Sequence, residues 1–417
     1  MESSNKTFKS MPIGQKFATV LTLYLTIASF LPQLYVIPGY QLSIFLVTFL
    51  WLFTTFIQHP GFYVYNRNIG TLLIVGSTVL IPYIFNNGII GNRYLAHGIM
   101  IVFYLIYMYN EKYGFSKSNE IVIKTSFPLV VYTSVITLVA LLENPYISRS
   151  IKSSGEYSDM IRAKGVGGYE FIYFLTILSV IIFYRTLSKN RISGSRFSSK
   201  STQLSLLFLF VVTIVFSNYL TALMILIIAF SIIIFARNRS AIIRITYLFT
   251  LIILTIFSRW IGLFIIDVFM RVIGGGSTYN KLLFIKAELI NSGSVWTIAT
   301  DRIGTLNESI SSFIDNILFG IVVKPIEFSG GYLVGFGQHS FIFDTLALFG
   351  MIIGSLTIFI YFWPLVKQIK KSSLNRALKI AILISATILF VFNNATISIG
   401  YALYFIYPYY LARLSQE

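Results

Sequence analysis

The sequence predicts an all-α, polytopic membrane protein that forms a single integral membrane domain over residues 1–417. Three observations predict this class: the chain is 56% hydrophobic, only 11% of its residues are charged, and its apolar residues fall in long runs. A soluble domain carries about 25% charged residues. A soluble core does not hide this much apolar surface, so lipid must cover part of it.

The apolar runs give the helices in order. A transmembrane helix needs about 20 apolar residues, and the runs predict about twelve such helices. The predicted spans are 17–37, 40–58, 69–86, 95–110, 121–142, 169–187, 203–217, 219–236, 245–266, 340–362, 380–397 and 399–411.

Two stretches, 203–236 and 380–411, fit either a hairpin of two spans or one long helix. A single crossing at 203–236 would put the basic loops 188–202 and 237–244 on opposite faces of the membrane. Cytoplasmic loops are enriched in Lys and Arg, so the charges favour a hairpin at 203–236.

The basic residues also predict the orientation. With the N-terminus inside, 21 of the 32 Lys and Arg residues fall inside and 11 outside, whereas the 15 acids divide into 4 inside and 11 outside. We therefore expect both termini in the cytoplasm. The inside excess accounts for the net charge of +17 and would attract anionic membrane lipid, so we expect no nucleic-acid partner.

Two predicted outer loops are long, at 143–168 and at 267–338, and the second lies between the ninth and tenth spans. Long loops inside a compact fold usually carry function. The larger loop has apolar residues at helical spacing near 279–290 and 306–314, and the second stretch places Leu306, Ile310, Phe313 and Ile314 on one face. We expect these stretches to be short amphipathic helices on the outer membrane surface, serving either as a structural cap or in function.

His339 lies at the end of the large loop, directly before the tenth span. An imidazole there is able to accept a proton near neutral pH, and a helix-capping or interfacial role is an equal alternative. Asp344 lies about one and a half turns into the span, where a carboxylate needs a partner or a wet cavity. Gly350 and Gly354 on the same helix form a pair suited to close helix packing.

Cationic side chains are spread over both outer loops, and guanidinium groups suit phosphate. Each alone is a surface charge, but as a set on one face they predict a diphosphate site. The candidates are Arg149, Lys152, Arg162, Lys164, Arg271 and Arg302. The chain has no cysteine, and its outer loops have no clustered acids or metal-binding motif, so we expect neither a metal nor a cofactor.

The segment from His339 to Gly354, HSFIFDTLALFGMIIG, resembles the signature of bacterial Wzy-type polysaccharide polymerases and O-antigen ligases. In that family a histidine ends the large outer loop, and an apolar helix start and a glycine pair follow. Arg302 and the pair Phe319-Gly320 resemble the loop arginine and turn of the family. The stretch 217–230 resembles a family helix that often begins with Ser-Arg, but this chain has Asn218 in place of the arginine, which leaves the role of that position open.

The resemblance implies a GT-C-like, metal-independent glycosyltransferase. Such an enzyme polymerises undecaprenyl-diphosphate-linked oligosaccharide repeat units into surface polysaccharide on the outer face of the membrane. It also implies a chain-length regulator and a flippase of the same pathway as partners. His339 and Arg302 are then the catalytic residues. The residues expected to bind substrate are Arg149, Lys152, Arg162, Lys164, Arg271 and Asp344.

Two alternatives stay open. A ligase would transfer the finished glycan to another acceptor, and the sequence does not separate it from a polymerase. A flippase or transporter of lipid-linked oligosaccharide should show internal repeats, and the chain shows none. The sugar, the linkage and the kind of polymer are also open.

Overall fold

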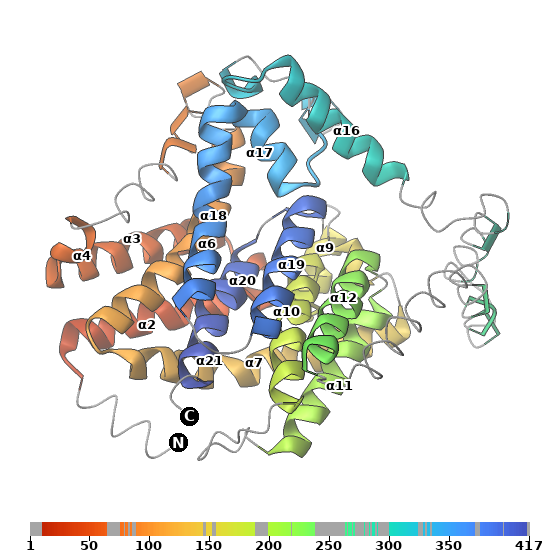
Figure 1. The fold of residues 1–417 in the computed structure, drawn as a ribbon, viewed down its shortest axis with the longest axis horizontal. Coiled ribbons are helices and arrows are strands. Elements are labelled where there is room, and N and C mark those ends of the chain that lie inside the picture. The colour runs from red at the N-terminus through yellow and green to blue at the C-terminus, as the bar shows by residue number, and fades with distance from the viewer. Residues whose placement is uncertain are drawn as a thin grey trace.

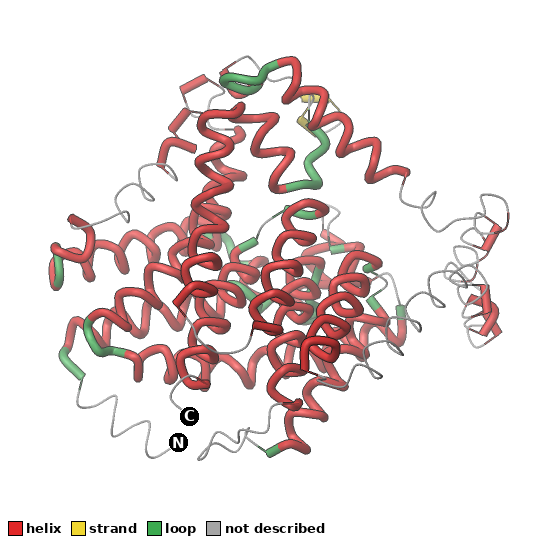
Figure 2. Tube along the Cα trace, viewed as in Figure 1, coloured by secondary structure: helices red, strands yellow, loops and turns green. Residues whose placement is uncertain are grey.

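The computed structural model is built almost entirely of helices, with one short two-stranded ladder (Figures 1 and 2). It describes residues 11–64, 76–78, 80–81, 84–85, 89–144, 147–151, 156–187, 199–217, 219–237, isolated positions between 263 and 290, 300–323, 328–329, 332–333, 336–371, 376–394 and 396–414.

In chain order the described elements are α2 (Ile13–Ala28), η1 (Pro32–Val36), α3 (Tyr40–Gln58), α4 (Gly61–Val64), α6 (Ile89–Lys112), α7 (Ser116–Glu143), α8 (Ile147–Ser150), α9 (Glu156–Ala163), α10 (Tyr169–Leu187), α11 (Lys200–Phe216), α12 (Leu220–Arg237), α16 (Thr300–Asp315), η4 (Ile321–Val323), β1 (Phe328–Ser329), β2 (Tyr332–Leu333), α17 (Phe341–Phe349), η5 (Gly350–Gly354), α18 (Ser355–Lys371), α19 (Arg376–Phe392), α20 (Ile397–Gly400), η6 (Tyr401–Ile406) and α21 (Tyr407–Leu414).

Four stretches of the described chain are long and apolar enough to cross a membrane: Tyr40–Gln58, Ser116–Glu143, Tyr169–Leu187 and Phe341–Lys370. Shorter apolar helices accompany them at Ile13–Ala28, Lys200–Phe216 and Thr221–Ala236. The chain is thus a helical membrane protein, as the composition predicts. The predicted spans 69–86 and 245–266 lie mostly outside the described residues.

Helix α10 lies at the centre of the bundle and α3 at its edge. In α10, 72% of the membrane-length window is buried, against 28% in α3. Phe45, Phe49 and Phe53 recur every four residues along one exposed face of α3. An exposed apolar face of this kind is stable against lipid rather than water.

The chain reverses between α11 and α12, which is the hairpin that the loop charges favour. Both helices pack along α10. Tyr219, just before α12, contacts Tyr169 at the start of α10, and Phe230 stacks on Phe183 near its end with 4.0 Å between ring centroids. Helix α12 therefore begins at the start of α10 and runs parallel to it. If α11 and α12 formed one straight helix, α11 would extend beyond the start of α10 and would not contact it.

The stretch 380–411 is also a hairpin. Helix α19 ends at Phe392, and the helical run α20–η6–α21 begins at Ile397. Tyr401 packs on Phe174 near the start of α10, and the Tyr410 ring lies 5.3 Å from the Arg185 guanidinium near its end. The last run therefore follows α10 along its length, after the chain has reversed beyond α19.

The predicted span 340–362 is not one straight helix. Gly350, at φ +67°, ends α17, and the π-helical turn η5 leads into α18. The ring centroids of Phe341 and Tyr361 lie 4.6 Å apart. Twenty residues of straight helix would separate them by about 30 Å. Helix α17 therefore folds back along α18 (Figure 1).

A buried polar network joins α2, α6 and α7 at the end of these helices that the charges place inside. Gln15 Nε2 donates to Ser118 Oγ at 2.8 Å and to Asn110 Oδ1 at 3.2 Å. Asn110 Nδ2 in turn donates to Asn119 Oδ1 at 2.6 Å. Hydrogen bonds between apolar helices fix their register, because a buried polar group without a partner is costly.

Candidate functional site

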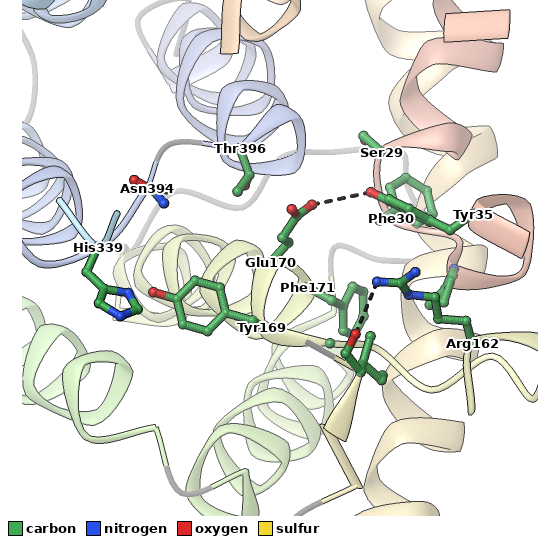
Figure 3. A pocket seen from close by; sticks show the side chains of 13 residues that line it. Ser29, Phe30, Tyr35, Arg162, Tyr169, Glu170, Phe171, His339, Asn394 and Thr396 are labelled. Carbon is green, nitrogen blue, oxygen red and sulfur yellow. Dashed lines mark hydrogen bonds between the residues drawn. The ribbon is translucent and has the colours of Figure 1, made fainter. Parts of the chain in front are cut away.

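A cavity of about 220 Å³ lies between the C-terminal end of α2 and the start of α10 (Figure 3). Its walls come from six parts of the chain: the residues after α2 with η1, the residue after α8, helix α9, the start of α10, the residue before the N-cap of α17, and the residues before α20. The lining residues are Ser29, Phe30, Pro32, Tyr35, Ile151, Arg162, Gly168, Tyr169, Glu170, Phe171, His339, Asn394 and Thr396.

The cavity gathers segments that the sequence places on one face. The loop 143–168 contributes Arg162, the end of the loop 267–338 is followed by His339, and the connection between α19 and α20 contributes Asn394. These positions are far apart in sequence, so only the fold brings them to one end of the bundle.

His339 is held between the large loop and α19. Asn394 Nδ2 donates to the Gln338 carbonyl oxygen at 2.8 Å, and the Phe341 amide donates to the Asn393 carbonyl oxygen at 3.1 Å. Gln338 has φ +58°, which is uncommon for a residue other than glycine. Ser340 then caps α17, since its Oγ accepts from the Phe343 amide. In Figure 3 the His339 ring and the Tyr169 hydroxyl point toward one another.

Asp344 does not line the cavity, although the sequence predicted it to bind substrate. Its side chain is 2% exposed, and both carboxylate oxygens are occupied. Ser309 Oγ donates to Oδ1 at 2.6 Å, and the Ser340 amide donates to Oδ2 at 3.0 Å. Ser309 Oγ also accepts from the Gly337 amide at 2.8 Å. These four residues form a latch, the Ser309–Asp344 latch, that fastens α16 to the segment carrying His339.

Helix α16 confirms the amphipathic helix predicted near 306–314. Its partly buried Phe313 packs against a small apolar core that includes Phe336, Leu348 and Phe349. Ile314, which was expected on the same face, is 60% exposed. The other predicted stretch, 279–290, lies mostly outside the described residues.

Two glycines of the motif form a backbone crossing beside this core. A Cβ on Gly320, at φ +69°, would lie 2.1 Å from the Leu348 carbonyl oxygen. A Cβ on Gly350, at φ +67°, would lie 2.4 Å from the Leu318 carbonyl oxygen. The Met351 amide also donates to the Ile317 carbonyl oxygen across the same contact. Only glycine permits both the backbone angles and the approach.

Glu170 is the cavity residue that sequence reasoning missed. It lies in the first turn of α10, and its Oε2 accepts from the Tyr35 hydroxyl at 3.3 Å. Acidic residues are common in the first turn of a helix because they interact favourably with the helix dipole, so Glu170 at this position does not by itself indicate a functional role. The available signal was a carboxylate just inside an apolar span, where it needs a partner or a wet cavity.

Arg162 is the one predicted cation that the structure places in the lining of the cavity. One guanidinium nitrogen donates to the Ile151 carbonyl oxygen at 3.1 Å, and the group lies 5.8 Å from the centre of the Tyr35 ring. Its ion pair with Asp159 is long, at 3.5 Å. The guanidinium is thus positioned at the cavity by Ile151, Tyr35 and Asp159.

The other predicted cations lie elsewhere or outside the described part of the chain. Arg149 is exposed and its guanidinium lies 5.2 Å from the centre of the Tyr219 ring. Lys164 and Arg271 are exposed and do not line the cavity. Lys152 and Asn218 lie outside the described residues, and Arg302 lies on α16 with its side chain outside the description.

Chemically, the site offers a carboxylate, an imidazole and a guanidinium within one small cavity, with aromatic walls from Phe30, Tyr169 and their neighbours. Among the described residues no three His, Asp or Glu side chains gather in a way that would hold a metal ion. The fold and the cavity define a helical membrane protein with a polar site at the ends of its helices. Compared with known proteins, the chain matches no family model, no curated protein and no solved structure.

Proposed function

We propose that this chain is a GT-C-like glycosyltransferase of the cytoplasmic membrane. It joins undecaprenyl-diphosphate-linked oligosaccharide repeat units into a polysaccharide on the outer face. The observation that carries the proposal is the shared cavity, in which His339 from the motif and Arg162 from the predicted diphosphate set line one space. A transfer between two lipid-linked sugars needs a cation for the leaving diphosphate and a polar group for the attacking hydroxyl, side by side.

Arg162 would bind the diphosphate of the donor. Charge builds up on this group as the sugar–oxygen bond breaks, and a guanidinium held in place beforehand stabilises that charge. Arg302, the second catalytic residue that the family resemblance implies, lies on α16, which packs on α17.

His339 would position the acceptor hydroxyl from the opposite wall. Its backbone is fixed on both sides, by Asn394 at Gln338 and by the cap at Ser340, so the ring has a defined place. Positioning of reacting groups is itself a large contribution to catalysis.

The size of the cavity limits what enters it. Pockets for drug-sized ligands have about 300–1,000 Å³. At about 220 Å³, this cavity accommodates the reacting groups but not a whole lipid-linked oligosaccharide. We infer that the polyprenyl tail lies along the apolar outer surface of the bundle and that the growing glycan lies outside the helices.

The test is a glycan profile from bacteria that lack the protein, complemented with the wild type, His339→Ala or Arg162→Ala. Expected are single lipid-linked repeat units and no polymer ladder in the deletion strain and in both variants, with each variant present in the membrane at the wild-type level. Lys164→Ala is the matched control, because it removes one positive charge two residues from Arg162 and outside the cavity lining.

Two other outcomes would replace the proposal. A ladder that persists in the deletion strain but stays on the lipid carrier would identify a ligase. Repeat units that accumulate only on the cytoplasmic face would identify a flippase.

A further inference from the structure

We propose that Glu170 is the proton acceptor of this site, taking the proton from the attacking sugar hydroxyl, and that Tyr35 holds it in position. The inference rests on the proposed glycosyl transfer and adds a catalytic residue to it. It begins from geometry: Glu170 lines the cavity together with His339 and Arg162. Figure 3 shows its carboxylate reaching toward Tyr35.

The carboxylate of Glu170 has unused capacity to accept a hydrogen bond. Within the described part of the chain, its one hydrogen bond is from the Tyr35 hydroxyl to Oε2, at 3.3 Å. A carboxylate accepts up to about four hydrogen bonds. Oε1 is therefore available to a ligand in the cavity, where an incoming sugar hydroxyl would replace the missing donor.

Asp344, the other acid near His339, lacks this property. Its two oxygens are bonded to Ser309 and Ser340, and the residue does not line the cavity. A general base must reach the proton that it removes, within hydrogen-bond distance in a plausible pose. Of these two acids, only Glu170 meets this condition.

Tyr35 connects the two charged groups of the cavity. Its hydroxyl donates to Glu170, its ring packs on Tyr40 with 4.4 Å between centroids, and the Arg162 guanidinium lies over the same ring. The groups that face Glu170 are therefore Tyr35 from η1, Arg162 from α9 and, across the cavity, His339.

In the proposed transfer, the acceptor hydroxyl oxygen forms a bond to the anomeric carbon of the donor sugar. The bond from that carbon to the diphosphate oxygen breaks, and its electron pair stays on the leaving lipid diphosphate, beside Arg162. The hydroxyl proton passes to Glu170 and is later released to water. The atoms of the new glycosidic bond, the leaving diphosphate and the transferred proton all come from the two lipid-linked sugars.

The experiment uses the purified full chain in detergent, with the glycolipid fraction extracted from deletion cells as the probe. Glu170→Gln preserves the shape and still accepts from Tyr35, but it cannot take a proton. We expect it to lower kcat by roughly 10²–10⁴-fold with KM little changed, because general-base catalysis contributes about that factor. We also expect the acid limb of the pH–rate profile to disappear in this variant, and to persist in His339→Gln.

Tyr35→Phe provides a second readout that does not depend on Glu170→Gln folding correctly. It removes a hydrogen bond that favours the ionised carboxylate, so the acid limb should move to higher pH. A limb that stays in place would contradict the assignment of that limb to Glu170. Thermal unfolding in detergent shows whether each variant retains the fold.

The outcomes separate the two proposals. If the wild type polymerises the glycolipid and Glu170→Gln does so at a similar rate, the role of Glu170 is wrong and the proposed function stands. If His339→Gln removes the acid limb instead, His339 is the base. If the wild type forms no polymer from this fraction, the proposed function is wrong, and the role of Glu170 falls with it.

Discussion

Replacement of Ser309 by alanine tests how the segment that carries His339 is held. Ser309 is fully buried, with 0% of its surface exposed. Its hydroxyl donates to Asp344 Oδ1 at 2.6 Å and accepts from the Gly337 amide at 2.8 Å. Alanine removes both hydrogen bonds, and water does not reach either partner to replace them.

The magnitude follows from those two bonds. A hydrogen bond to a charged group contributes about 1.5–3 kcal/mol, and a buried amide without an acceptor costs about 1–3 kcal/mol. Asp344 keeps its bond from the Ser340 amide, so we take the lower part of the sum, about 2.5–4 kcal/mol. Because 1.4 kcal/mol is a factor of ten, the latch should open roughly 60- to 700-fold more often.

Amide hydrogen exchange of the full chain in detergent measures this opening. In Ser309→Ala, peptides covering 336–344 should exchange faster by that factor, while the α10 peptides should stay unchanged because opening is local. Polymer formation should fall as well, since His339 loses its fixed place. Ser311→Ala, an exposed serine on the same helix, is the matched control. Exchange of 336–344 that matches this control would refute the reasoning.

Gly350→Ala should lower the stability of the fold by about 2–4 kcal/mol, because a Cβ would lie 2.4 Å from the Leu318 carbonyl oxygen and φ is +67°. Gly304→Ala meets nothing within 4 Å in α16 and should instead raise stability by about 0.5–1 kcal/mol. Thermal unfolding in detergent measures both changes, and equal midpoints for the two variants would contradict the crossing. Arg162→Ala should weaken binding of inorganic pyrophosphate by roughly 10- to 100-fold, the loss of a charged hydrogen bond. Calorimetry with Lys164→Ala as the comparison measures this effect, and equal losses from the two variants would show that loop charge acts without the cavity.

The sequence predicted well those parts of the fold that depend on composition and charge. The reversal at 217–219 followed from loop charges alone, because a single crossing would have inverted every later loop. Helix α16 followed from apolar spacing, since a period near 3.6 places Leu306, Ile310 and Phe313 on one side. The charge of a loop and the spacing of apolar residues both depend only on neighbouring positions in the sequence, so both can be evaluated without a structure.

The break at Gly350 depends on a contact rather than on composition. The stretch from Phe341 to Lys370 is uniformly apolar, and hydropathy is the same for a straight helix and for one that folds back. What bends it is the approach of Gly320 from the large loop, which a linear pattern does not contain. Glycine in an apolar helix predicts close packing, but not whether the partner is another helix or a turn.

The cavity could be predicted only in part for a similar reason. The diphosphate set was chosen by charge and by side of the membrane, and one of its members, Arg162, lines the cavity. Lys164, two residues further along, is exposed. The difference arises because α9 ends at Ala163, so that one residue faces η1 and the other solvent. A helix of this length inside a loop leaves little trace in the sequence.

Most of the residues that carry the family resemblance hold the backbone around the cavity in place and do not line the cavity. Gly320 and Gly350 cross, and Asp344 fastens α16, whereas His339 is the member of the motif that reaches the cavity. The other charged groups of the cavity, Arg162 and Glu170, come from α9 and α10, outside the motif. At the crossing of Gly320 and Gly350, steric contact allows only glycine, so the fold limits which residues can occur there. At Arg162 and Glu170, the ligand that the cavity binds sets the limit instead. We therefore expect substitutions in 300–354, apart from those at His339 and Arg302, to act mainly through folding, and substitutions in 156–170 to act on the choice of substrate while the protein stays folded.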